Sequence, residues 1–148
     1  MGPPASQIED TERAAAALRR VGYRVTPQRL VIHRALVELD RHVGAEELLE
    51  AVAKRLPNVS LPTVYATLDA LEEAGLVRRV AAGRGRALYD AQPASHHHLV
   101  CRRCGAVEDL SVEVPLEGAL HSAAEAGFAA DGAEVVVHGL CARCRERA

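Results

Sequence analysis

The stretch Ser95-His-His-His-Leu-Val-Cys-Arg-Arg-Cys104 places three consecutive histidines directly before a Cys-x-x-Cys pair. Side chains alternate between the two faces of an extended chain, so we expect His96 and His98 on one face and His97 on the other. Two imidazoles on one face can hold an exchangeable metal, whereas a Cys-x-x-Cys pair needs two further soft ligands to complete a tetrahedron. The second pair, Cys141-Ala-Arg-Cys144, supplies them. The sequence therefore predicts two chemically different metal sites, one structural and one sensing.

Length and composition indicate packed structure. The 148 residues suit one domain of ordinary size or two small ones. Hydrophobic residues make up 49% and aromatic residues only 3%, so a core must consist mainly of Leu, Val and Ala. All four cysteines lie in the two Cys-x-x-Cys pairs, for which a disulfide framework is the competing interpretation. Because no signal peptide, long apolar span or lipidation motif is visible, we expect a cytoplasmic protein with no membrane partner, reduced thiols and bound zinc.

The net charge of −2 is unevenly distributed along the chain. From Arg13 to Val37 there are six arginines and no acidic residue, whereas after Ser95 eight acidic residues outnumber five basic ones. A basic N-terminal half joined to an acidic C-terminal half fits a DNA-reading module joined to a metal-binding one. A solvated, arginine-bearing helix without a nucleic-acid partner is the alternative that charge alone leaves open.

The N-terminal half predicts a winged helix-turn-helix domain. Helix propensity and apolar periodicity predict helices over residues 8–21, 27–39, 45–56 and 61–75, with Thr26 and Ser60 as N-caps. Residues 76–80 and 87–89 are typical of a β-hairpin, and its turn at 83–86 is Gly-Arg-Gly-Arg. This order of elements would place the helix Leu61–Gly75 in the major groove of DNA. A helical domain with an incidental hairpin is the plainer alternative.

The rest of the chain predicts a small α/β domain. Strands are expected at 97–101, 106–110 and 134–139, and a helix at 116–126. The expected boundaries are 1–89 for a winged-helix DNA-binding domain, 90–95 for a hinge and 96–148 for a dimerisation and metal-binding domain, which gives an α+β fold. About 50 residues with a thin core need both zinc and a partner subunit to be stable, so we expect a homodimer.

Four motifs together resemble the ferric uptake regulator family of metal-dependent transcriptional repressors. They are Tyr23-Arg-Val-Thr-Pro-Gln-Arg29, Thr63-Val-Tyr65, Gly75-Leu-Val77 and His96-His-His-Leu-Val-Cys-Arg-Arg-Cys-Gly105. The resemblance covers nearly the whole chain. It implies a homodimer that binds operator DNA when loaded with a divalent metal and releases the DNA when the metal is lost or oxidised.

The resemblance also assigns two sets of metal ligands. The structural zinc ligands fall on Cys101, Cys104, Cys141 and Cys144. The regulatory ligands fall on His42, Asp90, His96, His98 and Asp109. Three imidazoles and two carboxylates without a thiolate suit Fe(II) or Mn(II). Because His42 precedes the hinge and the other four lie in or beyond it, a bound ion would tie the two domains together and fix the angle between the DNA-reading heads.

The sensed signal remains open at this point. Zinc sensors of the family usually carry a Cys near the position of Asp90, so Asp here argues against the zinc-sensing branch, and a zinc- or nickel-responsive uptake regulator is kept as the alternative. Asp109 matches the peroxide-responsive branch, in which a liganding histidine is oxidised, whereas iron-uptake regulators tend to carry Glu there. Peroxide sensing and plain iron or manganese sensing are both retained.

An additional metal site of the family would use His97 and a histidine eight residues before the third Cys, where this chain has Ala133. His138 is the substitute that the sequence offers, although an ordinary strand residue is the favoured interpretation of it. His33 and His121 are expected to be ordinary helix-surface residues.

Residue type and place select the DNA contacts. The predicted DNA-binding residues are Arg24, Arg29, Thr63, Tyr65, Arg84 and Arg86. Arg24 resembles the family's basic minor-groove residue, and narrow A·T-rich grooves attract cations, so we expect an A·T-rich palindromic operator. Tyr65 can present its ring to a thymine methyl group, while Arg29, Arg84 and Arg86 suit phosphates.

Two other classes of protein remain as alternatives. Fe(II) held by histidines and carboxylates also describes non-haem iron oxygenases. Those enzymes need an open pocket in a substantial barrel, for which this chain has too few strands, and we therefore predict no enzyme. A zinc-ribbon interaction module is the other alternative, and it would need neither His42 nor the arginine-rich wing.

Overall fold

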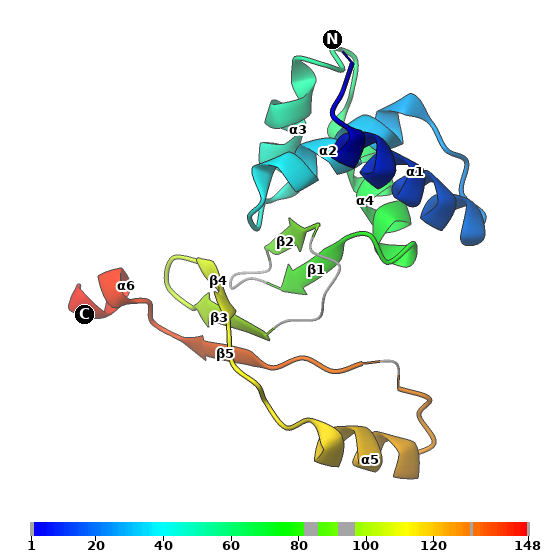
Figure 1. The fold of residues 1–148 in the computed structure, drawn as a ribbon. Coiled ribbons are helices and arrows are strands. Elements are labelled where there is room, and N and C mark those ends of the chain that lie inside the picture. The colour runs from blue at the N-terminus through cyan, green and yellow to red at the C-terminus, as the bar shows by residue number, and fades with distance from the viewer. Residues whose placement is uncertain (1, 82–85, 92–96, 131, 148) are drawn as a thin grey trace. The chain divides into compact units, whose positions relative to one another are not determined.

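The structure is a computed structural model, and it describes residues 2–81, 86–91, 97–130 and 132–147 (Figure 1). The chain divides into two compact units. Met1–Ala81 and Ala87–Pro93 form the first, and Ala82–Arg86 and Ala94–Ala148 form the second. The predicted boundaries at 89 and 96 stay predictions, because residues 92–96 lie outside the described ranges. Each unit is described by itself.

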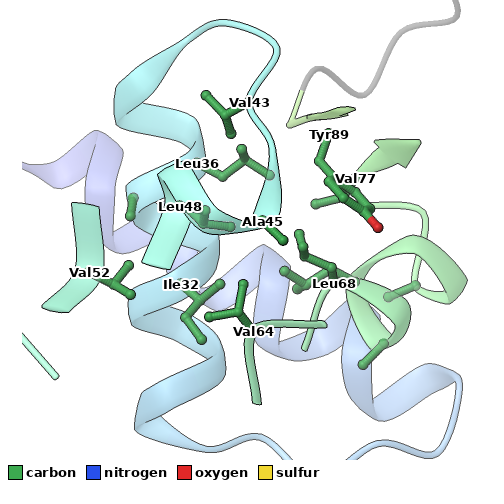
Figure 2. Packing of buried hydrophobic residues seen from close by; sticks show 14 of the residues in the cluster. Ile32, Leu36, Val43, Ala45, Leu48, Val52, Val64, Leu68, Val77 and Tyr89 are labelled. Atoms are coloured by element: carbon green, nitrogen blue, oxygen red, sulfur yellow. The ribbon is translucent and has the colours of Figure 1, made fainter. Parts of the chain in front are cut away.

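The first unit contains four helices followed by a β-hairpin. The helices are α1 (Ala5–Arg20), α2 (Pro27–Leu39), α3 (Ala45–Ala53) and α4 (Leu61–Glu73), and the strands are β1 (Arg78–Ala81) and β2 (Ala87–Asp90). Their apolar faces meet in one core, in which Ile32, Val64 and Leu68 lie close together at the centre (Figure 2). Leucine, isoleucine, valine and alanine supply all of this core except Tyr89, as the composition predicts.

The helices begin at the predicted capping residues. The Thr26 side chain accepts a hydrogen bond from the backbone N–H of Arg29, and Pro27 occupies the first helical position of α2. Ser60 accepts in the same way from Thr63 at the start of α4. The predicted third helix is shorter than expected, because α3 ends at Ala53 rather than at Leu56.

The hairpin is antiparallel, with Arg79 opposite Tyr89 and Val80 opposite Leu88. Of its predicted arginine-bearing turn at 83–86, residues 83–85, including Arg84, lie outside the described residues. A further antiparallel bridge joins Val43 to Tyr89, so the turn between α2 and α3 is bonded to β2. This bridge was not predicted, and it determines where His42 lies.

The second unit contains a three-stranded sheet and two helices. Its elements are β3 (His97–Cys101), β4 (Val107–Leu110), α5 (Glu117–Glu125), β5 (Val136–Gly139) and α6 (Ala142–Glu146). The strand order is β4-β3-β5, in which β3 is antiparallel to β4 and parallel to β5. The short α6 was not predicted. Among the described residues, no helix has the length and apolar character needed to cross a lipid bilayer.

Candidate metal centres and DNA-reading surface

Four cysteines converge at one end of the sheet in the second unit. Cys101 ends β3 and pairs in register with Gly139 of the parallel strand β5. Because parallel strands end at the same edge of a sheet, the Cys-x-x-Cys sequences that follow β3 and β5 meet there. All four sulfur atoms lie within 4.8 Å of one another, and those of Cys104 and Cys141 are 3.8 Å apart. The predicted zinc ligands are thus brought together without a disulfide.

Backbone and side-chain contacts hold this knuckle in shape. Cys101 donates its N–H to the carbonyl of Ala106 and accepts from the N–H of Gly105, whose φ of +74° closes the turn. The guanidinium of Arg103 donates to the carbonyl of Cys144 at 3.0 Å, which ties the first Cys-x-x-Cys to the second.

The electrostatics of the cluster favour a cation. Hydrogen bonds from the backbone of Cys104 and Cys141 lower the pKa of the Cys101 thiol to about 5. Burial, together with the neighbouring sulfurs, raises the pKa of the Cys144 thiol to about 12. Four thiolates therefore cannot coexist here unless a positive ion compensates their charge, and a compact set of four sulfur ligands fits tetrahedral Zn(II).

One histidine–aspartate pair among the predicted regulatory ligands lies in the first unit. Val43 and Tyr89 exchange two backbone hydrogen bonds of 3.0 and 2.8 Å, which places His42 opposite Asp90. His42 Nε2 and Asp90 Oδ2 are 3.5 Å apart, and both side chains are almost completely buried. Two atoms that bind one metal at about 2.1 Å each are separated by about 3–4 Å, so this pair has the spacing of two ligands.

Another histidine–aspartate pair lies in the second unit and is built in the same way. His98 faces Asp109 across the antiparallel pair of β3 and β4. His98 Nε2 and Asp109 Oδ1 are 3.8 Å apart, with the histidine fully buried and the carboxylate 38% exposed. Imidazole and carboxylate ligands suit Fe(II) or Mn(II), which agrees with the predicted regulatory cofactor. The fifth predicted ligand, His96, lies outside the described residues.

The structure does not bring His97 and His138 together. In the parallel pairing, His138 is in register with Val100, so its side chain shares a sheet face with His98 and Val100 rather than with His97. His97 Nδ1 also accepts a 2.9 Å hydrogen bond from the backbone N–H of Val135. The prediction of an additional metal site formed by His97 and His138 is therefore wrong, because the strand register places the two side chains on opposite faces of the sheet.

The predicted DNA-reading residues of the first unit lie at its surface. On α4, Tyr65 is 41% exposed and Thr63 half-buried, while Val64, Thr67 and Leu68 point into the core. Arg24 is exposed, as is Arg86, which belongs to the second unit. The helix thus presents a small, polar front with one aromatic ring, as expected of a helix that reads the major groove.

Arg29 has contacts that its predicted phosphate role did not anticipate. Its guanidinium donates a hydrogen bond to the carbonyl of Arg24 and lies 5.3 Å from the centroid of the Tyr23 ring. Burial and the nearby Glu73 carboxylate raise the pKa of the Tyr23 hydroxyl, which shows that this ring lies beside the end of α4. Arg29 and Tyr23 therefore brace the loop that carries Arg24.

The fold and sites together define a winged-helix DNA-binding protein with two kinds of metal centre. Comparison with known proteins identifies the family: the model of the ferric uptake regulator family matches residues 20–138. The chain belongs to this family. It is a metal-responsive transcriptional repressor, and the predicted α+β fold is confirmed. Since the family is one of transcriptional regulators, it gives no support to the oxygenase alternative.

Individual relatives represent several branches of the family. The peroxide-responsive repressor PerR of Staphylococcus epidermidis is 28% identical over 137 residues, covering 93% of this chain and 91% of that protein. The ferric uptake regulator of Pseudomonas aeruginosa, solved with manganese, is 30% identical with a TM-score of 0.69, covering 87% and 98% of the two chains. A zinc uptake regulator solved with zinc and DNA is 32% identical with a TM-score of 0.66, covering 97% and 98%.

Proposed function

We propose that this protein is a homodimeric repressor whose affinity for operator DNA is controlled by one Fe(II) or Mn(II) ion on each chain. The proposed ligands are His42, Asp90, His96, His98 and Asp109. The observation that carries the proposal is the repeated histidine–aspartate pair, one in the first unit and one in the second, each with ligand-like spacing.

The chain length between the pairs supports a shared ion. Asp90 and His97 are joined by only six intervening residues, which can span at most about 25 Å. An ion bound by both pairs favours only those conformations that bring both units to it. To shift the protein from mostly the metal-free conformation to mostly the DNA-binding conformation, the ion must bind the second conformation about 5 kcal/mol more tightly than the first. One ligand does not supply this difference.

Zinc has a separate, structural role in this proposal, at Cys101, Cys104, Cys141 and Cys144. Few side chains are buried in the second unit, and α5 buries none in the single chain. Large apolar side chains are instead exposed there: Val112, Leu120, Phe128, Val137 and Leu140. Exposed apolar surface of this kind marks a protein–protein interface, which supports a dimer formed through the second unit.

The first unit is the proposed DNA-binding domain of this cytoplasmic repressor. Helix α4 enters the major groove, with Thr63 and Tyr65 at the bases and Arg24 in a neighbouring minor groove. Arg29, Arg84 and Arg86 supply positive charge to the phosphates. The preference of Arg24 for a narrow groove makes an A·T-rich palindrome the proposed operator.

The decisive experiment is a Mn(II) titration of DNA binding, followed by fluorescence anisotropy. The wild-type protein is expected to bind a palindromic operator only when Mn(II) is present. His42→Ala should abolish this metal dependence while the zinc content and the dimer persist, because it removes a ligand from the first unit alone. His121→Ala, which changes an exposed histidine on α5, is the matched control and should behave as wild type. Metal-dependent binding by His42→Ala would contradict the proposed site.

Peroxide is the proposed signal within this framework, supported by the Asp109 ligand and the similarity to a peroxide-responsive repressor. The Fe(II)-loaded protein treated with dilute peroxide should gain one oxygen atom on the peptide that carries His42 or His96 and should lose its DNA. The Mn(II)-loaded protein should do neither. Peptide mass spectrometry and anisotropy on the same samples measure both effects. If mass and DNA binding are unchanged with Fe(II), the protein is a plain iron or manganese repressor.

A zinc- or nickel-responsive role is the second candidate, favoured only by the identity to the zinc uptake regulator. The proposed regulatory ligands contain no cysteine, which makes them poorer ligands for zinc than a thiolate-bearing set. The test compares the free Zn(II) and Mn(II) concentrations at which DNA binding is half-maximal. This candidate is supported if Zn(II) acts at a lower free concentration than Mn(II), after correction for the generally higher affinity of nitrogen and oxygen ligands for Zn(II).

A further inference from the structure

A pocket of about 470 Å³ in the first unit has no role in metal or DNA binding. It lies between α1, α2 and the turn that follows α4, and it also reaches Ala91. This volume falls within the range of small-molecule sites in proteins. Its lining includes Arg13 and Arg20 of α1, His33 of α2 and Leu76.

The buried imidazole of His33 is the most informative side chain of this pocket. His33 is only 8% exposed, contrary to its predicted place on a helix surface. Its side chain forms no hydrogen bond with any residue in the described ranges. Burial lowers the pKa of its imidazole, so the ring is neutral near pH 7 and offers one donor and one acceptor. Because the ring lines the pocket, water satisfies its nitrogen atoms in the free protein, and a ligand oxygen can take the place of that water.

The pocket exists because α1 is rich in alanine. Ala16 and Ala17 form part of the wall, and Leu76 and Ala74 add to it from the turn after α4. Methyl-sized side chains on α1 leave space that a leucine would fill. The wall is therefore apolar and suits a short aliphatic or aromatic body.

The rim of the pocket carries two arginines, Arg13 and Arg20, and one carboxylate, that of Asp10. Arg13 and Arg20 are seven residues apart, so they lie two turns apart on one face of α1. Arg13 forms an ion pair with Asp10, whereas Arg20 forms no ion pair with any residue that the structure describes. Arg20 is thus the cation available to an acidic ligand.

From these features we propose that the first unit binds a small organic carboxylate with a short aromatic or branched aliphatic body. The carboxylate pairs with Arg20, the apolar body packs against Ala16, Ala17 and Leu76, and a ligand oxygen accepts a hydrogen bond from His33. This site is separate from the proposed metal and DNA sites, so its test does not depend on them.

The test is a titration of the zinc-loaded full-length protein with benzoate, phenylacetate and isovalerate. The histidine ring nitrogens are observed by long-range ¹H–¹⁵N NMR, with the His33 signal assigned from His33→Gln. At least one acid should shift the His33 signal saturably, and benzamide, which lacks the charge of benzoate, should bind at least about fivefold more weakly. If none of the three acids shifts the His33 signal, the proposal is wrong.

Variants of α1 establish where the acid binds. Arg20→Gln should weaken binding about fivefold, whereas Arg19→Gln, which removes the same charge from the neighbouring position outside the pocket, should stay within about twofold of wild type. Ala16→Leu should block binding, because Ala16 is exposed and its larger replacement fills the pocket mouth. Equal weakening by Arg19→Gln and Arg20→Gln would mean that the acid binds to the general positive charge of α1, and would overturn the proposed site.

Discussion

A histidine that faces an aspartate across an antiparallel strand pair occurs once in each unit. In both places the spacing is set by backbone hydrogen bonds rather than by the side chains themselves: the Val43–Tyr89 bridge sets one and the β3–β4 register sets the other. The proposed ligands are therefore oriented before a metal binds. Less conformational entropy is then lost on binding, which increases metal affinity.

Single residues of the DNA-reading surface should differ in what they contribute. Tyr65→Ala is expected to cost about 1–3 kcal/mol of operator binding and to reduce sequence preference, because Tyr65 is proposed to contact bases. Arg86→Ala should weaken all DNA sequences alike and reduce the slope of log K against log salt by about one, because one phosphate contact is lost. Anisotropy at several salt concentrations, with operator and scrambled DNA, separates the two effects.

Tyr65→Phe provides the control for that comparison, since it keeps the ring and removes only the hydroxyl. It should retain most of the sequence preference. If Tyr65→Ala discriminates operator from scrambled DNA as well as wild type does, α4 is not the recognition helix.

At the scale of elements, glycines end three of the helices in the same way. After α1, α4 and α5, the residues Gly22, Gly75 and Gly127 have positive φ, and the next residue donates its N–H to a carbonyl five positions back. This is the Schellman motif, which satisfies carbonyls that the helix end leaves unbonded. After α4 it also directs the chain into β1 and so connects the recognition helix to the wing.

Gly75→Ala should therefore destabilise the first unit. A Cβ at this position meets no atom within 4 Å, so the cost comes from the φ of +73° alone and should be about 1–2 kcal/mol. Gly75→Asn is the matched control and should cost less, because asparagine tolerates the left-handed region better than alanine. Thermal unfolding followed by far-ultraviolet circular dichroism measures both variants. Equal stability of Gly75→Ala and wild type would show that residue 75 does not hold the left-handed conformation in solution.

At the scale of the whole molecule, zinc and dimerisation should depend on each other. A structural zinc site contributes roughly 10 kcal/mol or more to folding, and the second unit has little buried apolar surface to replace it. Cys104→Ser is therefore expected to give zinc-free protein that is monomeric or misfolded in the second unit, measured by metal analysis and light scattering. Arg102→Ala, which alters an exposed residue between two ligands, should keep both zinc and the dimer. A zinc-free Cys104→Ser dimer with normal DNA affinity would refute the structural role.

The sequence by itself determined the features that depend on neighbouring residues. Thr26 and Ser60 predicted helix starts, and residues 97–101 predicted a strand in which His97 and His98 point to opposite faces. Capping, turn chemistry and side-chain alternation act over a few positions, so they can be read without knowledge of the fold. The types of ligand at the two metal sites followed equally from residue chemistry, although the assignment of individual ligands such as His42 relied on the family resemblance.

Tertiary structure decided which distant residues meet. The Val43–Tyr89 bridge, the register that puts His138 on the face opposite His97, the contact of Arg29 with Tyr23 and the burial of His33 were not evident from the sequence. Each depends on how strands pair or helices pack over long separations. A shift of one residue in strand register would turn His138 to the other face, and no local pattern in the chain fixes that register. Such contacts are settled by the packing of the whole unit, in which many weak interactions are satisfied together.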